Sequence, residues 1–206
     1  MRITVMTRRW ARPGQEEALL AASMAQMAQI APQRQTEESG QVFQGLLDPR
    51  QMLYLATWPN REAYLHHTEQ SAIDARLDPL CAEPPRRYLL RRWVAYQNPR
   101  AHATAMECVL IVSPPGQHEV TRAFVLRDAG PRIRTMPGFC YRRVYQDLDT
   151  PDHLVIVRGW DSPAAWQHFR SEIEPMLDLA SRRFGATLEH FVGVVQREFG
   201  SARSEA

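Results

Sequence analysis

The amino-acid sequence repeats itself at a constant offset of 102 residues along its length of 206 residues. Pro13-Gly14-Gln15 aligns with Pro115-Gly116-Gln117, and Trp58 aligns with Trp160. Other identities in the same unbroken register are Glu17 with Glu119, Gln44 with Gln146, Ala63 with Ala165 and His66 with His168. A period of this length is too long for a solenoid repeat, so each copy is predicted to form a small domain.

Both copies predict the same order of elements, β-α-β-β-α-β, which is the order of a ferredoxin-like unit. The boundary is expected in the polar, proline-containing stretch 98–102, which gives units at 1–100 and 103–200 and a flexible tail at 201–206. The expected helices are 15–30 and 60–80 in the first copy, and 117–128 and 162–183 in the second. The expected strands are 3–6, 41–47, 52–58 and 88–96, then 107–112, 139–148, 154–160 and 191–197.

Two of these strands, 52–58 and 154–160, are apolar on both faces. A half-exposed antiparallel sheet would alternate apolar and polar residues instead. Helices cover one face of a ferredoxin-like sheet, so the sheet of the other copy is the simplest cover for the second face. The predicted fold class is therefore α+β, with two tandem ferredoxin-like units whose antiparallel sheets pack into a pseudo-dimeric α+β barrel.

Composition excludes several kinds of chemistry. The chain has no lysine, so it has neither a phosphate-binding Walker lysine nor a Schiff-base lysine, and no G-x-G-x-x-G motif occurs. Its three cysteines are far apart and lack a C-x-x-C pair, which predicts reduced thiols and no metal site. A net charge of +2 does not favour nucleic acid. With no signal peptide or membrane-spanning stretch, a cytoplasmic protein with no membrane partner is expected.

Several local patterns, clearest in the second copy, resemble the antibiotic biosynthesis monooxygenase family of the dimeric α+β barrel superfamily. They are Pro137-Gly138-Phe139, Asp147-Leu148-Asp149, a strand ending at Trp160, and the segment 161–166. Because single-copy members pair as homodimers, the resemblance implies that this tandem chain forms a pseudo-dimer internally, and a further homodimer is left open. The superfamily also contains cofactor-free oxygenases, haem-binding and haem-degrading proteins, and isomerases.

In the first copy, Tyr54 and Trp58 share one strand face by the two-residue period, and Tyr64 follows in the next helix. The resemblance implies that anthrone-oxidising relatives hold a Trp and a Tyr at this spacing, with an Asn four residues before the Trp. Tyr54 stands at that Asn position here. Trp58, Tyr64 and His66 are the predicted catalytic residues of this copy, and Tyr54 and His67 are expected to contact substrate. Either His66 or His67 could deprotonate a phenol, and His66 is the better candidate because it shares its register with His168.

In the second copy, Trp160 and Trp166 hold the equivalent aromatic positions. Arg158 lies on the same strand face as Trp160, and His168 shares the register of His66. Arg158, Trp160 and Trp166 are predicted to bind substrate, with His168 as the catalytic histidine. Since Phe169 replaces His67, a second possibility is that one copy has lost its site.

The expected function is cofactor-independent oxidation of a small aromatic, quinol or polyketide-type substrate by O₂, with these two molecules as the partners. The alternative is a module that binds haem or another small ligand without turnover, since one neutral histidine such as His66 or His168 suffices as an axial ligand. The remaining feature is a set of arginine clusters, expected to be solvated strand edges or a docking site for an acidic molecule. They comprise Arg86, Arg87, Arg91, Arg92, Arg132, Arg134, Arg142 and Arg143.

Overall fold

The computed structural model describes residues 1–31, 40–71 and 73–199, so the predicted tail at 201–206 lies outside the described residues. The chain forms two compact units, of which unit 1 contains Met1–Arg91 and the residues from Gly193 onward, and unit 2 contains Arg92–Val192. The last strand of each sequence copy therefore begins in one unit and ends in the other. The division into copies at 1–100 and 103–200 describes the sequence repeat and stays a prediction.

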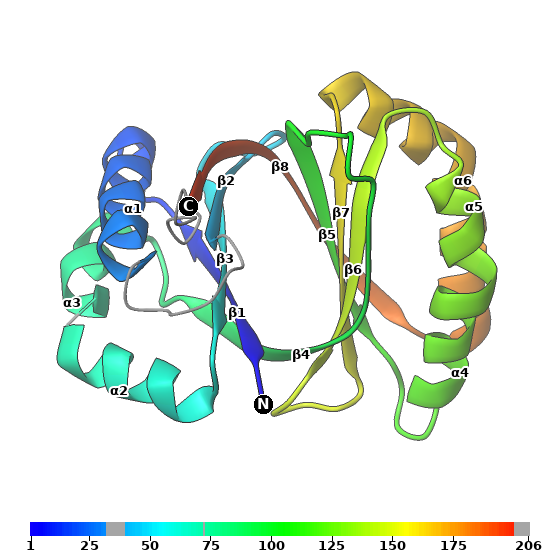
Figure 1. The fold of residues 1–206 in the computed structure, drawn as a ribbon, viewed down its shortest axis with the longest axis horizontal. Coiled ribbons are helices and arrows are strands. Elements are labelled where there is room, and N and C mark those ends of the chain that lie inside the picture. The colour runs from blue at the N-terminus through cyan, green and yellow to red at the C-terminus, as the bar shows by residue number, and fades with distance from the viewer. Residues whose placement is uncertain (32–39, 72, 200–206) are drawn as a thin grey trace, which may run out of the picture. The chain divides into compact units, whose positions relative to one another are not determined.

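The elements follow the predicted order in both copies (Figure 1). Those of the first copy are β1 (Ile3–Trp10), α1 (Glu16–Ile30), β2 (Gly40–Gly45), β3 (Gln51–Trp58), α2 (Arg61–Ser71), α3 (Ile73–Leu77), η2 (Asp78–Leu80) and β4 (Arg86–Gln97). Those of the second copy are β5 (Ala105–Val112), α4 (His118–Ala123), η3 (Phe124–Ala129), α5 (Gly130–Arg134), β6 (Phe139–Asp147), β7 (His153–Trp160), α6 (Pro163–Phe184) and β8 (Thr187–Phe199).

All strand pairs are antiparallel. In unit 1, β1 lies between β3 and β4, and β2 lies between β3 and β8. In unit 2, β7 lies between β5 and β6. The strand order closes as β1-β3-β2-β8-β5-β7-β6-β4, which is an eight-stranded antiparallel barrel, so the predicted fold class is confirmed.

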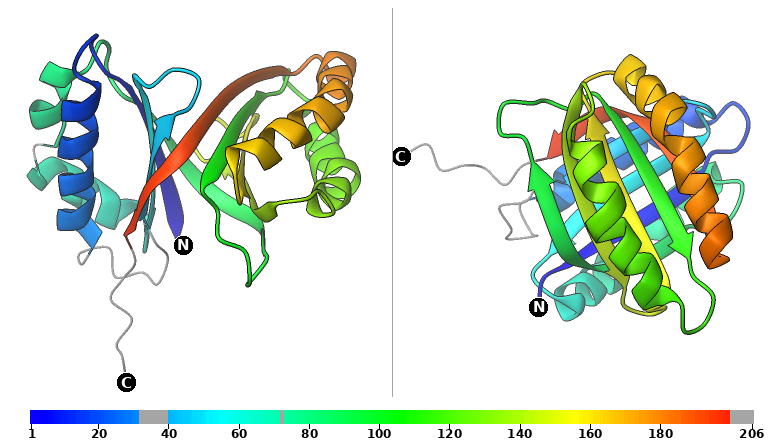
Figure 2. Two further views of the ribbon diagram at one scale, coloured as in Figure 1. Left: turned by 90° about the horizontal axis from the view of Figure 1, so that it is seen from above. Right: turned by 90° about the vertical axis from the view of Figure 1, so that its right-hand side faces the viewer.

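Helices cover one face of the sheet in each unit. In unit 1 these helices are α1, α2 and α3, and in unit 2 they are α4, α5 and α6, which lie over the strands of their sheet in Figure 2. The face toward the helices carries buried apolar side chains, including Trp58 in unit 1 and Val144 and Leu154 in unit 2. The opposite face of β3 is buried and apolar as well, with Leu53 and Leu55. Among the described residues, no helix is long and apolar enough to cross a membrane.

Local sequence signals set the helix ends. The Asn60 Oδ1 accepts a hydrogen bond from the Ala63 amide at 2.8 Å, and the Ser162 Oγ accepts one from the Ala165 amide at 3.2 Å. Both are the N-cap contacts expected of these residue types. Helix α6 ends at Gly185, whose φ of +66° lies in the left-handed region that favours glycine.

The helix expected at 117–128 is longer than predicted. It continues through a π-helical segment, η3, and through α5 as far as Arg134. Gly130 and Pro131 suggest a helix end in the sequence, but a proline is tolerated in the first turn of a helix, where its missing N–H has no intrahelical partner. The final strands β4 and β8 also extend beyond their predicted limits at both ends.

Candidate functional site

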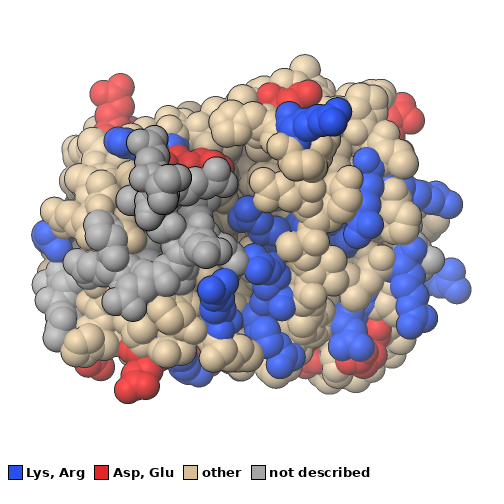
Figure 3. Space-filling view, in the orientation of Figure 1, with Lys and Arg blue, Asp and Glu red and all other residues tan. Residues whose placement is uncertain are grey.

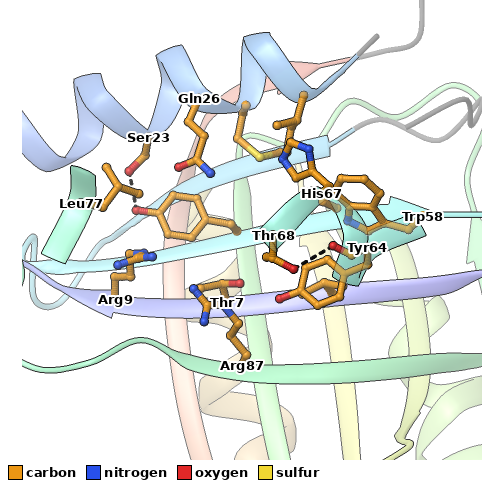
Figure 4. Close-up of a pocket in the computed structure, with 15 residues that line it drawn as sticks. Thr7, Arg9, Ser23, Gln26, Trp58, Tyr64, His67, Thr68, Leu77 and Arg87 are labelled. Atoms are coloured by element: carbon orange, nitrogen blue, oxygen red, sulfur yellow. Dashed lines mark hydrogen bonds between the residues drawn. The ribbon is translucent and has the colours of Figure 1, made fainter. Parts of the chain in front are cut away.

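Pocket 1 lies within unit 1, between the sheet and its helices. Strands β1, β3 and β4 form one wall, and helices α1, α2 and α3 form the other (Figure 4). The lining residues are Val5, Thr7, Arg9, Ser23, Gln26, Met27, Ile30, Tyr54, Ala56, Trp58, Tyr64, His67, Thr68, Leu77 and Arg87.

Secondary-structure periodicity explains which side chains reach this pocket. The β3 residues Tyr54 and Trp58 alternate with residues that face the other side of the sheet, as their two-residue spacing predicted. On α2, Tyr64 and His67 are three residues apart and therefore share one helix face. His66 lies two residues after Tyr64, is exposed, and is not among the residues that line the pocket.

Trp58 is the centre of an aromatic cluster in pocket 1. Its ring centroid lies 5.8 Å from that of Tyr64 at an interplanar angle of 62°, and 5.0 Å from that of His67 at 36°. The Nε2 atom of His67 is buried and has no hydrogen-bond partner among the described residues. Burial lowers the pKa of His67 below its ordinary value of 6.5, so the imidazole is neutral at pH 7. A neutral imidazole beside an aromatic wall is equipped to accept a proton.

Two tyrosines present neutral hydroxyl groups at the pocket. The Ser23 Oγ donates to the Leu19 carbonyl at 2.6 Å, so the Tyr54 hydroxyl, 2.7 Å away, donates its proton to Ser23. Burial raises the pKa of Tyr54, and it also raises that of Tyr64. Both phenols therefore stay protonated at neutral pH, and Tyr64 can serve as a hydrogen-bond donor.

An ionic cluster borders pocket 1 at the end away from His67 (Figure 4). Arg9 is buried and pairs with Asp74 and, at 3.1 Å, with Asp78, while Arg87 also pairs with Asp74. Burial by itself lowers the pKa of Arg9, but its contacts with Cys81, Asp74 and Asp78 raise it above the ordinary value. The two guanidinium groups and two carboxylates balance in charge. The cluster therefore fixes the polar end of the pocket without adding a net charge.

The sequence reasoning did not identify Arg9, Ser23 or Arg87 as site residues. Val5, Thr7 and Arg9 alternate along β1, and this two-residue period was the available signal for Arg9. No comparable signal marks Arg87, because its position depends on how β4 pairs with β1.

The equivalent aromatic corner of unit 2 is filled by side chains. The Phe169 ring, at the position of His67, stacks on Trp160 with centroids 4.7 Å apart, and Phe139 packs against the same indole at 5.5 Å. Trp160 and Trp166 are buried, and neither is among the residues that line the pocket of this unit. His168 is exposed on α6. The structure thus brings together the predicted residues of the first copy, except His66, but not those of the second.

Pocket 2 lies in unit 2, and its lining residues do not include Trp160, Trp166 or Phe169. Only some of its positions are equivalent to those that line pocket 1. Six lining positions match those of pocket 1 at the offset of 102 residues, and at four of them an apolar residue replaces a polar one. The six are Val109, Ile111, Val125, Ala129, Ile156 and Arg158, in place of Thr7, Arg9, Ser23, Met27, Tyr54 and Ala56. Of the residues predicted for the site of the second copy, Arg158 lines pocket 2, where it pairs with Glu107.

The arginine clusters divide between surface and interior. Basic side chains are spread over the face of the molecule shown in Figure 3. Neighbouring arginines in strands face opposite sides of the sheet. Arg142 is only 1% exposed, which corrects the expectation that it belongs to a solvated edge.

Within the described residues, no group of three or more His, Cys, Asp or Glu side chains is arranged to hold a metal ion.

Residues 110–174 match the model of the antibiotic biosynthesis monooxygenase family, which confirms the resemblance seen in the second copy. No protein of curated function matches the sequence.

Solved structures share the fold across nearly the whole chain. An anthrone oxidase-like protein is 13% identical, with a TM-score of 0.75 over 100% of this chain and 95% of its own. A monooxygenase-like protein of Listeria innocua is 12% identical, with a TM-score of 0.54 over 96% and 95%. The haem-degrading enzyme LmHde of Listeria monocytogenes is 9% identical, with a TM-score of 0.52 over 93% and 98%. At these identities the likeness concerns the fold.

Proposed function

We propose that the protein oxidises a small aromatic, quinol or polyketide-type substrate with O₂ in pocket 1, without a cofactor. The match of residues 110–174 to the antibiotic biosynthesis monooxygenase family model supports this class of reaction. The observation that carries the proposal is the neutral His67 beside the aromatic pair Trp58 and Tyr64, with a buried Nε2 that has no hydrogen-bond partner among the described residues. The similarity in fold to an anthrone oxidase-like protein supports the same class of substrate.

The residues of pocket 1 suit the proton transfer that starts such a reaction. His67 Nε2 accepts the proton of the substrate phenol or enol. The Trp58 and Tyr64 rings hold a flat substrate, and the Tyr64 hydroxyl donates a hydrogen bond to the oxyanion that forms. The resulting anion is electron-rich enough to reduce O₂ directly, which removes the need for a bound redox group.

The overall reaction balances for an anthrone-type substrate. The anion transfers one electron to O₂, and the two radicals combine to form a C–O bond and a hydroperoxide. Loss of water from the hydroperoxide breaks the O–O bond and leaves a carbonyl. The CH₂ group and O₂ thus become C=O and H₂O, and the proton taken by His67 leaves with the water.

The proposal is tested by oxygen uptake with a panel of anthrones and hydroquinones. We expect His67→Gln to lower kcat by about 10² or more, because general-base catalysis is typically worth 10² to 10⁴. Trp58→Phe and Tyr64→Phe should also lower turnover. His66→Gln and His168→Gln are the matched controls, since both side chains are exposed. Unchanged turnover in all three pocket variants would show that the reaction takes place elsewhere.

Haem binding without turnover is the alternative, and the residues present do not fit it well. The expected ligands, His66 and His168, are exposed and are not among the residues lining either pocket. The histidine that lines pocket 1, His67, packs against the Trp58 indole with ring centroids 5.0 Å apart. A haemin titration followed by absorption tests this alternative. A saturable Soret shift that is lost in a histidine variant would favour it over oxygenation.

A further inference from the structure

Four ionisable side chains form a row across neighbouring strands of unit 2. Arg158 on β7 lies directly opposite Glu107 on β5 and directly opposite Arg142 on β6, so the three side chains share one face of the sheet. His190 on β8, the strand next to β5, extends the row on the other side of Glu107. The counterparts of these residues in the first copy, Val5, Ala56, Gly40 and Tyr88, carry no charge.

Glu107, Arg142 and Arg158 are buried, His190 is exposed, and the buried part of the row is not electrically neutral. Glu107 pairs with Arg158 at 2.5 Å and with His190 at 3.5 Å. Although burial alone raises the pKa of Glu107, Arg158 and His190 hold it below its ordinary value, so it is ionised. Arg142 has no carboxylate partner among the described residues and donates a hydrogen bond to the Val125 carbonyl at 2.6 Å. Two guanidinium groups thus face one carboxylate.

An uncompensated charge in an apolar interior is costly. Burial, followed by the charges of Arg158 and Arg134, lowers the pKa of Arg142 to about 9, which still leaves it protonated at neutral pH. The Nε atoms of Arg142 and Arg158 are both buried without a hydrogen-bond partner in the described part of the chain. The site therefore has spare hydrogen-bond donors and a spare positive charge, which an anion would satisfy.

Pocket 2 opens onto this row. Arg158 and His190 line it, and most of its other walls are aliphatic and aromatic carbon from residues such as Phe124, Leu177 and Phe184. The π-helical segment η3 contributes Phe124 and Val125, and a π segment of this kind often marks a functional site. A pocket with charged side chains at one end and apolar walls elsewhere is suited to a small organic acid, whose carboxylate and apolar part would match these two regions.

We propose that pocket 2 binds a monocarboxylic acid with an apolar body, whose carboxylate is held by Arg158 and His190 in the positive field of Arg142. The duplicated fold then carries two different sites, a polar aromatic pocket in unit 1 and an acid-binding pocket in unit 2. This site does not depend on the oxygenation proposed for pocket 1, because the two pockets have no lining residue in common.

The probes are benzoate, 1-naphthoate and octanoate, each compared with the alcohol of the same body by calorimetric titration of the full chain. We expect at least one acid to bind at least about 10-fold more tightly than its alcohol, as charge-assisted hydrogen bonds are roughly twice as strong as neutral ones. Glu107→Gln should tighten acid binding, since it removes the internal carboxylate that competes for Arg158. The double variant Glu107→Gln/Arg158→Gln should weaken it about 10-fold or more.

The double variant removes both partners of the buried pair and so avoids an unpaired Glu107, which keeps the test independent of misfolding. His67→Phe, which alters pocket 1, is the control and should leave acid binding unchanged. The proposal is overturned if none of the acids binds below 1 mM, roughly the weakest affinity worth assigning to a specific site. It is equally overturned if acid and alcohol bind alike, or if Glu107→Gln weakens binding.

Discussion

The His67 imidazole packs against the Trp58 indole with ring centroids 5.0 Å apart, and its buried Nε2 has no hydrogen-bond partner within the described residues. At the same position of the second copy, Phe169 stacks on Trp160 at 4.7 Å and has no polar atom to satisfy. The exchange of histidine for phenylalanine is thus one of the differences between an aromatic corner that lines a pocket and one that is packed core. This difference supports the possibility that the second copy has lost the original site.

The pH dependence of turnover should report His67. Its pKa is lowered by burial from 6.5, so the proton is lost at a lower pH than in a free histidine. We expect the midpoint of the acid limb of kcat/KM for the oxidation to lie below 6.5, the ordinary pKa of histidine. A profile measured with an active quinol checks this. His67→Gln should remove the acid limb, and a limb retained in that variant would assign it to another group.

His67→Phe should stabilise the fold while abolishing turnover. A buried polar atom without a partner costs about 1 to 3 kcal/mol, and the phenyl ring packs in the second copy without that cost. In the wild type, His67 binds a proton more readily in the unfolded chain than in the folded one, so the wild type loses stability as the pH falls below 6.5. Phenylalanine does not titrate, so the stability gained by His67→Phe should grow over the same range. Urea unfolding at two pH values measures both effects. His66→Phe is the exposed control, and a loss of stability in His67→Phe would contradict the argument.

Arg142→Met and Arg158→Met should change stability in opposite directions. Replacing Arg142 removes a buried charge that has no carboxylate partner in the described residues, so we expect a neutral effect or a gain of about 1 to 4 kcal/mol. Replacing Arg158 leaves the Glu107 carboxylate buried without its guanidinium partner, which should cost about 3 to 5 kcal/mol. Denaturant unfolding of the two variants side by side gives the answer, and losses of equal size would disprove the charge imbalance.

Gly159→Ala should destabilise unit 2. A Cβ atom at this β7 position would lie 2.1 Å from Cε1 of Tyr141, the residue opposite it on β6, so the buried ring would have to move. Overpacking of this kind costs about 1 to 3 kcal/mol. Thermal unfolding measures the loss. In the double variant with Tyr141→Ala the clash disappears, so its loss should be smaller than the sum of the two single losses. Simple additivity would mean that the ring does not restrict this position.

Much of the fold is determined by the sequence itself. The offset of 102 residues predicts two equivalent units, and the cap residues Asn60 and Ser162 predict where α2 and α6 begin. The two-residue period of β3 predicts that Tyr54 and Trp58 face the same way, which pocket 1 confirms. These features follow from local geometry, since strand alternation and helix capping depend on residues close together in the chain.

The register shared with His168 makes His66 the preferred catalytic histidine in the sequence, but the structure places His67, three residues after Tyr64, on the pocket face of α2. Which face of α2 turns toward the sheet, however, depends on packing against β3. The catalytic roles predicted for His66 and His168 remain predictions that their variants will test. The alignment of His66 with His168 shows that the two positions are equivalent in the two copies. It does not show whether their side chains face the sheet or the solvent.

Only the tertiary structure revealed the row of His190, Glu107, Arg158 and Arg142. These residues are far apart in sequence, and they meet because β7 pairs with both β5 and β6 and because β8 lies next to β5. Local sequence determined the elements and the strand face of each side chain, since both follow from nearby residues. Strand pairing decided which charges are buried together and which pocket keeps its polar groups, since those outcomes depend on contacts between distant segments.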